Sequence, residues 1–149
     1  MEKGPGMIVV VDTSVWIDFF RGRPDRHVET LEQLLTAGDD VCLCGVILAE
    51  VLQGIRSDID YRKTKTYLEF LLYLPMDRST FEMAAENYRI LRKKGVTVRK
   101  PADCMIASVA IEQNIPLLHN DRDFDPIEKH CGLEVLRVAS GPIAGRRGG

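Results

Sequence analysis

The sequence predicts an α/β fold, a three-layer α/β/α sandwich with a mostly parallel sheet of about four or five strands. Residues 7–11 form a short, unbroken apolar run, which is typical of a strand buried on both faces. Short runs of this kind alternate with segments of helical periodicity along most of the chain. The chain has 149 residues and no internal repeat, so we expect one domain with its own hydrophobic core.

The first strand, at residues 7–11, is followed by a short predicted helix over residues 14–20. The turn composition of Arg21-Gly22-Arg23-Pro24 ends this helix. The next helix is expected to begin after the cap residue Asp25 and to close at Gly38. Apolar residues recur along one side of it, so that this side faces the core.

A second strand is expected at residues 41–45, and a helix over residues 46–55 follows it. A longer amphipathic helix is predicted over residues 59–72, with an inward face that contains Tyr61, Leu68, Leu71 and Leu72. Residues 72–76 are predicted to hold a third, short strand, which Pro75 limits because proline cannot donate a backbone hydrogen bond.

The second half of the chain begins with a helix for which Ser79 and Glu82 have the capping-box spacing. Pro101 is expected at the first position of the next helix. That helix is apolar almost all round, so we expect it at the centre of the domain. The fourth and fifth strands are predicted at residues 116–119 and 133–138.

The expected domain spans residues 7–138, between a flexible extension at residues 1–6 and a disordered tail at residues 139–149. The formal net charge is −2 and the pI is about 5.9, so no overall basic field indicates nucleic-acid binding. No run reaches the roughly 18 apolar residues of a membrane span, and the N-terminus has no signal-peptide pattern. We therefore expect a cytoplasmic protein without a membrane partner.

The four cysteines, Cys42, Cys44, Cys104 and Cys131, are expected to be reduced residues of the core. Cys42 and Cys44 are two positions apart in a predicted strand, which suits burial on one face better than a bond between them. Neither a C-x-x-C nor an H-x(3–5)-H spacing occurs, so the sequence does not predict a zinc site.

Five acidic residues stand out because of their neighbours. Asp12 ends the first strand, and Asp103 lies in the first turn of the central helix. Asp121 follows the fourth strand, with Asp123 two residues further on. Taken singly, such aspartates can be helix caps or partners of a helix dipole. Glu50 differs, because it shares an apolar helical face with no Lys or Arg within one turn and needs a partner from elsewhere.

These carboxylates can converge at one edge of the sheet, because most of them follow strands or begin helices. Carboxylates gathered in one place repel one another unless some are protonated or hard divalent cations lie between them. Ligation by oxygen alone suits Mg²⁺ or Mn²⁺ and not zinc. Such ions can activate water and stabilise the charge on a phosphodiester, which indicates a metal-dependent hydrolase.

The segments VVDTSVWIDFF, LAEVLQG, KPADCMIASVA and LLHNDRDF resemble, in order and approximate spacing, the four acidic motifs of PIN-domain ribonucleases. The likeness is greatest to the VapC toxins of prokaryotic toxin–antitoxin pairs. It covers about residues 7–138, nearly the whole chain. Each motif is short, but four of them in order in a domain of this size are fairly specific.

The resemblance implies catalytic roles for four acids: Asp12, Glu50, Asp103 and Asp121. It implies that these residues, together with Asp123, form a pocket that binds Mg²⁺ or Mn²⁺, and either Asp121 or Asp123 can be the main ligand of the pair. Thr13 and Ser14 match the small polar residues that hydrogen-bond the carboxylates in that pocket.

The implied activity is endonucleolytic cleavage of RNA, either in single-stranded regions or in structured RNA such as tRNA or rRNA. Cleavage leaves a 5′ phosphate and a 3′ hydroxyl. The implied partners are the RNA substrate, a second copy of the chain in a symmetric homodimer, and a VapB-like antitoxin. Such an antitoxin buries an apolar groove and inserts a basic side chain into the acidic pocket.

Basic residues near the predicted site are candidates for contact with the RNA backbone. Six cations and no acid lie in the twelve residues that end at Lys100. Arg99 and Lys100 immediately precede the central helix and are best placed to meet a phosphate. Arg21 and Arg23 are weaker candidates, and the other four cations suit a solvated helix end. His119 is expected to be a core or supporting residue, because the metal mechanism needs no histidine.

Other interpretations remain open from the sequence alone: a stand-alone RNA-processing PIN nuclease, a non-catalytic docking protein, or a receiver-like magnesium-binding switch. A receiver needs a second acid beside Asp12 and an aspartate after its third strand, where this chain offers only Asp77. A haloacid-dehalogenase-type phosphatase needs a D-x-D motif after the first strand, and Ser14 occupies the second acidic position.

Overall fold

A four-stranded parallel sheet lies at the centre of the molecule, within residues 6–138, which the computed structural model describes. Its strands are β1 (Ile8–Val11), β2 (Asp40–Cys44), β3 (Leu72–Leu74) and β4 (Leu117–Leu118). They lie in the order β3-β2-β1-β4, and every neighbouring pair is parallel. Apart from Gly6, the expected extension at residues 1–6 and the expected tail at residues 139–149 lie outside the described residues.

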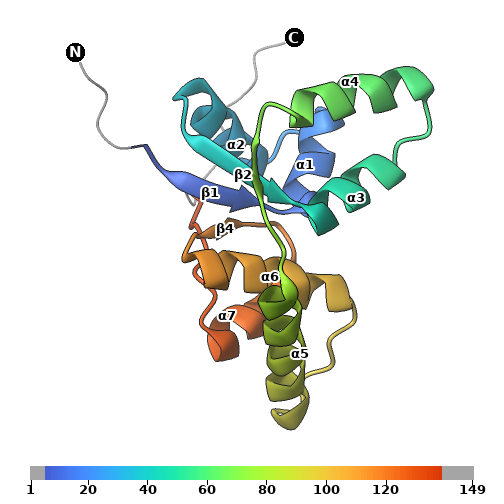
Figure 1. Ribbon diagram of the computed structural model, residues 1–149. Helices are drawn as coiled ribbons and strands as arrows, with labels where there is room; N and C mark the ends of the chain where they lie inside the picture. The colour runs from blue at the N-terminus through green and yellow to red at the C-terminus, as the bar shows by residue number, and fades with distance from the viewer. Residues whose placement is uncertain (1–5, 139–149) are drawn as a thin grey trace.

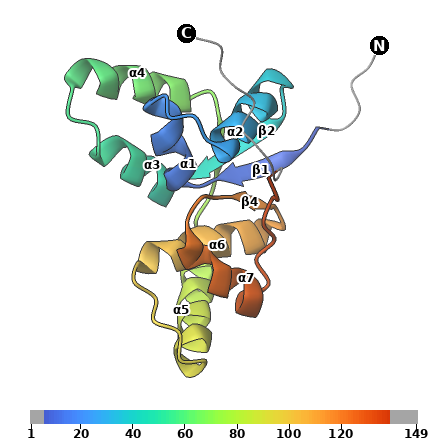
Figure 2. The ribbon, with the colours of Figure 1, turned by 180° about the vertical axis from the view of Figure 1, so that it is seen from behind.

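Helices cover both faces of the sheet and produce the three layers that the sequence predicts. Their bounds are α1 Thr13–Phe20, α2 Arg26–Thr36, α3 Gly45–Gln53, α4 Asp58–Leu68, α5 Arg78–Lys93, α6 Pro101–Gln113, the 3-10 turn η1 Arg122–Phe124, and α7 Asp125–Cys131. Helices α1 to α4 lie on one side of the sheet, and α5, α6 and α7 lie on the other (Figures 1 and 2). No helix within residues 6–138 is long and apolar enough to cross a membrane.

Strand β1 is deeply buried because it lies between β2 and β4 and between the two helical layers. The valines at residues 9–11 are fully buried, as are Trp16 of α1 and Ile106 of α6. Burial of each large apolar side chain contributes about 1.5–3 kcal/mol, so this packing holds the end of β1 firmly. Asp12, which follows β1 directly, therefore starts from a fixed backbone position.

The third strand and the helix before it differ from the prediction. The helix expected over residues 59–72 ends at Leu68. Leu68 is buried, but Tyr61 and Leu72, which we expected to face inward, are 38% and 48% exposed. Strand β3 lies at the edge of the sheet and pairs only with β2. An edge position exposes side chains that their apolar character alone would assign to the core.

Helix α5 begins two residues earlier than the spacing of Ser79 and Glu82 suggests. Asp77 is its N-cap residue, and the backbone N–H of Asp77 donates a 3.2 Å hydrogen bond to the hydroxyl of Thr80. The hydroxyl of Ser79 instead donates to Glu112 of α6, at 2.6 Å. The predicted capping box is therefore wrong, because a tertiary contact takes the Ser79 side chain.

The fifth strand expected at residues 133–138 is reduced to one isolated parallel bridge between Val135 and Leu117. Strand β4 has only two residues, so a longer ladder has no partner there. Helix α7, which precedes this bridge, was not predicted. All four cysteines are free, as expected, and three of them are buried while Cys131 is half-buried.

Candidate active site

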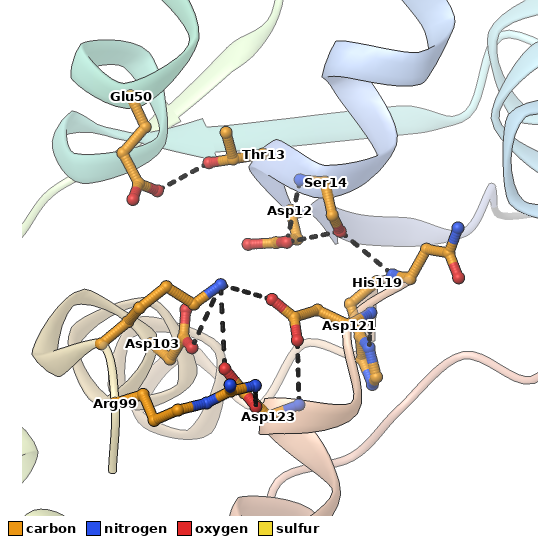
Figure 3. A network of polar contacts seen from close by, with 11 residues as sticks. Asp12, Thr13, Ser14, Glu50, Arg99, Asp103, His119, Asp121 and Asp123 are labelled. Atoms are coloured by element: carbon orange, nitrogen blue, oxygen red, sulfur yellow. Dashed lines mark hydrogen bonds and ion pairs between the residues drawn. The ribbon is translucent and has the colours of Figure 1, made fainter. Parts of the chain in front are cut away.

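Asp12 lies at the carboxyl end of β1, where the strand meets α1 (Figure 3). Its Oδ2 accepts hydrogen bonds from the backbone N–H and the hydroxyl of Ser14, at 3.0 and 2.6 Å. Asp12 is therefore the N-cap of α1; these bonds hold its carboxylate, and the residue as a whole is only 4% exposed. Burial raises the pKa of Asp12, although the hydrogen bonds from Ser14 oppose this shift.

Glu50 reaches the same region from α3. The hydroxyl of Thr13 donates a 2.7 Å hydrogen bond to its Oε1. The sequence indicates that Glu50 needs a partner from elsewhere in the chain, and this hydroxyl is one. Thr13 and Ser14 bind different carboxylates, so two consecutive residues at the start of α1 orient Asp12 and Glu50 together.

Asp103, Asp121 and Asp123 lie across from Asp12, and they come from α6, from the end of β4 and from η1 (Figure 3). One oxygen of each aspartate lies within 4.8 Å of those of the other two. Asp103 is in the first turn of α6, and Asp121 follows β4. The Oδ1 of Asp121 accepts the backbone N–H of Asp123 at 2.9 Å, so Asp121 also caps η1.

Two basic residues that precede α6 contact this cluster. The ammonium nitrogen of Lys100 lies 2.5 Å from Oδ2 of Asp121. The same nitrogen lies 3.8 Å from Oδ2 of Asp103 and 4.0 Å from Oδ2 of Asp123. The guanidinium of Arg99 donates a 3.0 Å hydrogen bond to Oδ1 of Asp123. Both residues were predicted as phosphate contacts, and in this structure their charges face the acidic cluster.

The carboxyl groups of the cluster differ in their affinity for protons. Burial raises the pKa of Asp103 to about 7, and the charge of Lys100 offsets this only in part. Oδ2 of Asp103 is buried and has no hydrogen-bond partner among the described residues. Burial also acts to raise the pKa of Asp121. The hydrogen bonds from Lys100 and from the Asp123 backbone outweigh that effect, so this pKa lies below its ordinary value.

Two neighbours of Asp121 support the site. Nδ1 of His119 accepts the backbone N–H of Asp121 at 3.1 Å. Burial lowers the pKa of His119, which favours the neutral ring with its proton on Nε2. The backbone N–H of Asn120 donates to the Ser14 hydroxyl at 3.1 Å and so connects the β4 end to α1. The sequence did not indicate Asn120, because its contact is made by the backbone N–H and does not depend on the identity of the side chain.

The two arginines after α1 lie further from the acids in this structure. Arg23 pairs with Asp18 of α1 at 3.6 Å. Arg21 lines a groove between α1, α3 and α4. No ion pair connects either arginine to the five acids among residues 6–138. Their predicted contact with RNA therefore requires a substrate that extends past the end of α1.

The chemistry of the donors fits a hard divalent cation. The five acids offer oxygen atoms alone, which are the ligands that Mg²⁺ and Mn²⁺ prefer. Oδ2 of Asp103 has no hydrogen bond among the described residues but lies 3.8 Å from the ammonium of Lys100, which indicates that positive charge is favoured between these groups. Asp103, Asp121 and Asp123 are the residues that would hold such an ion, with Asp12 and Glu50 beside them.

Comparisons with known proteins agree with this geometry. The family model of the PIN domain matches residues 9–129, which include all five acids. Ribonuclease VapC11 from Mycobacterium tuberculosis is 31% identical over 130 residues, which cover 86% of this chain and 97% of that protein. The chain belongs to the VapC ribonucleases of the PIN domain family. Another relative, ribonuclease VapC1 from Methanocaldococcus jannaschii, is 29% identical over 128 residues and 85% of each chain.

Solved structures of VapBC complexes share the fold of this VapC-type PIN domain. The crystal structure of VapBC2 from Rickettsia felis, bound to a DNA fragment from the promoter, matches with a TM-score of 0.71. That match has 22% sequence identity and covers 87% of this chain and 98% of the other. VapBC-5 from Mycobacterium tuberculosis matches with 28% identity and a TM-score of 0.62, over 88% and 98% of the two chains.

Proposed function

We propose that the acidic pocket is the site at which this VapC-type ribonuclease hydrolyses RNA phosphodiesters, with Mg²⁺ or Mn²⁺ as its cofactor. The observation that carries the proposal is the convergence of five carboxylates from the ends of β1 and β4, from α3, α6 and η1, one of them with a buried oxygen that accepts no hydrogen bond among the described residues. Such a group of acids is unfavourable without a cation between them.

The proposed mechanism assigns Asp103, Asp121 and Asp123 to hold the cation. A bound divalent ion would activate a water molecule and neutralise charge on the scissile phosphate. Asp12, fixed by Ser14, and Glu50, fixed by Thr13, are then placed to accept the proton of that water and to orient it. The P–O3′ bond breaks, and the departing 3′ oxygen takes up a proton from solvent, which leaves a 3′ hydroxyl and a 5′ phosphate.

The proposed substrate is RNA, held in part by exposed basic side chains at the edge of the pocket. Arg99 is the best placed of these, because its side chain is 76% exposed while it still contacts Asp123. Lys100, Arg21 and Arg23 are further proposed contacts with the phosphate backbone. The proposed site of action is the cytoplasm, where cellular RNA is available to such an enzyme.

Cleavage of purified RNA in the presence of Mg²⁺ or Mn²⁺ tests this function, with total RNA and end mapping to find the target. We expect cleavage to stop with a chelator and with Asp12→Asn while the protein stays folded. Asp18→Asn is the matched control, because Asp18 lies on the same helix and pairs with Arg23 outside the pocket. If Asp12→Asn cleaved as fast as Asp18→Asn, the proposed active site would be wrong.

The proposed protein partner is a VapB-like antitoxin, which a partly apolar groove between α1, α3 and α4 can receive. The groove has a volume of about 580 Å³, and its walls include Ile17, Phe20, Val51 and Ile55. Ile17 lies one helical turn after Thr13, so a basic side chain of a bound segment can reach the carboxylates from this end. The fold relatives from Rickettsia felis and Mycobacterium tuberculosis are both VapBC assemblies.

Co-purification with the antitoxin tests this partner. We expect Ile17→Asp with Ile55→Asp to abolish binding, whereas Ile59→Asp, at a 58% exposed position outside the groove, keeps it. Equal binding by both proteins would contradict the proposed groove.

A small antitoxin gene just upstream of this one is the expected genomic counterpart, and its absence would favour a stand-alone RNA-processing nuclease. The chain is also proposed to form a symmetric homodimer, and light scattering measures its mass in solution.

A further inference from the structure

Lys100 lies where the proposed metal ion would lie. Its ammonium group is within 4.0 Å of an oxygen of each of the three aspartates, and these oxygens are close enough to one another to share one cation. The contact at Asp121 is the shortest, at 2.5 Å. One of the atoms it approaches, Oδ2 of Asp103, has no hydrogen bond of its own among the described residues.

The position of Lys100 in the chain explains how it reaches the cluster. It is the N-cap residue of α6 and precedes Asp103 by three residues, so both side chains lie at the same end of the helix. Its own side chain is 49% exposed, whereas that of Asp103 is 6% exposed. The ammonium group therefore enters from solvent on a flexible stem, and it can leave by the same route.

A divalent cation and the Lys100 ammonium group need the same carboxylate oxygens. Two positive charges at this separation repel each other, so binding of the metal requires that Lys100 move out of the cluster. Arg99 need not move in the same way, because it contacts Oδ1 of Asp123 from a more exposed position, whereas Lys100 approaches Oδ2.

We propose that Lys100 is an internal counter-ion, which holds Asp103, Asp121 and Asp123 together in the metal-free protein and is displaced when the divalent cation binds. The proposal rests on the metal site of the proposed function and adds a regulator of that site. Lys100 thereby sets the concentration of metal at which the pocket fills. Once displaced, its charge lies at the rim of the pocket, where a phosphate of the substrate can receive it.

Direct titration of metal-free protein with Mn²⁺ tests this role, by calorimetry or by the electron paramagnetic resonance signal of free Mn²⁺. We expect Lys100→Met to bind Mn²⁺ about fivefold more tightly than wild type, since loss of a partly exposed ion pair corresponds to about 1 kcal/mol. Lys100→Gln should shift affinity in the same direction and provides a second, polar replacement. Lys94→Met is the matched control, because Lys94 is an exposed lysine of the same connecting segment.

The same variants separate a counter-ion from a residue that merely supports the fold. Without metal, the melting temperature of Lys100→Met should fall below that of Lys94→Met, and saturating Mn²⁺ should remove the difference. Mn²⁺ affinity in Lys100→Met and Lys100→Gln that equals or falls below that of wild type would overturn the proposal. If neither wild type nor any variant bound Mn²⁺, both this proposal and the metal site of the proposed function would be wrong.

Discussion

The hydroxyl of Thr13 donates a 2.7 Å hydrogen bond to Oε1 of Glu50 and so joins the end of β1 to α3. Thr13 is buried, and it is adjacent to Asp12, the first carboxylate of the pocket. The Thr13 side chain therefore connects the start of α1 to α3, although Thr13 and Glu50 are 37 positions apart in the sequence. Because the bond acts on a charged group, its loss is expected to affect activity more than stability.

Thr13→Val removes this hydrogen bond while it preserves the shape of the side chain. We expect kcat/KM for RNA cleavage to fall about 10- to 100-fold, because a hydrogen bond to a charged group contributes about 1.5–3 kcal/mol. Thr13→Ser keeps the hydroxyl and is the control, with activity close to wild type. Equal activity of the valine and serine variants would show that the orientation of Glu50 does not depend on Thr13.

Asp103 should make the stability of the metal-free protein depend on pH. Its pKa rises from 3.8 to about 7 on folding because of burial, so between these values the native chain holds a proton that the unfolded chain lacks. Stability therefore falls as pH rises from about 4 to about 7. We expect Asp103→Asn to exceed wild type in free energy of unfolding by about 4 kcal/mol at pH 8 and to match it near pH 4.

Urea unfolding with a chelator, at both pH values, measures this effect. Glu86→Gln, on the exposed side of α5, is a charge-matched control and should follow wild type at each pH. A gain in stability that is the same at pH 4 and pH 8 would mean that the substitution acts through packing and not through the charge of Asp103.

Removal of the metal should destabilise the wild-type protein at pH 8. Ligation of a divalent cation by Asp103 and Asp121, as proposed, would replace repulsion with attraction, and only the folded chain would provide the site. At 100 times the dissociation constant, Mn²⁺ is expected to add about 2.7 kcal/mol to the free energy of unfolding. Thermal unfolding with Mn²⁺ or chelator measures this gain. The double variant Asp103→Asn, Asp121→Asn should show none, and a gain of equal size in it would place the ion elsewhere.

His119 is expected to orient Asp121 as a neutral ring. Its Nδ1 accepts the backbone N–H of Asp121, and burial lowers its pKa, so the proton lies on Nε2 at neutral pH. The ¹⁵N chemical shifts of the ring should show this tautomer. His119→Leu leaves a partly buried N–H without an acceptor and should cost about 1–3 kcal/mol of stability. His119→Asn can restore an acceptor near Nδ1 and should lose less, whereas an equal loss in both would assign the effect to packing.

The sequence by itself determined the elements whose pattern is local. The apolar run at residues 7–11 identifies β1, and Pro101 identifies the start of α6, because strand burial and helix initiation depend on neighbouring residues. Those elements in turn place Asp12 and Asp103 at the edge of the sheet. The order of the four acidic motifs then identifies the family, which the match over residues 9–129 confirms.

Tertiary structure decided the contacts between segments that are distant in sequence. The exposure of Leu72 follows from the edge position of β3, and the Ser79 side chain bonds Glu112 of α6 while α5 begins after Asp77. The charge and sequence position of Lys100 predict a contact with phosphate. It lies instead among three carboxylates, because η1 and the segment before it bring Asp121 and Asp123 to the start of α6. Local pattern fixes where a charge lies along its own element, whereas its partner depends on how the layers pack.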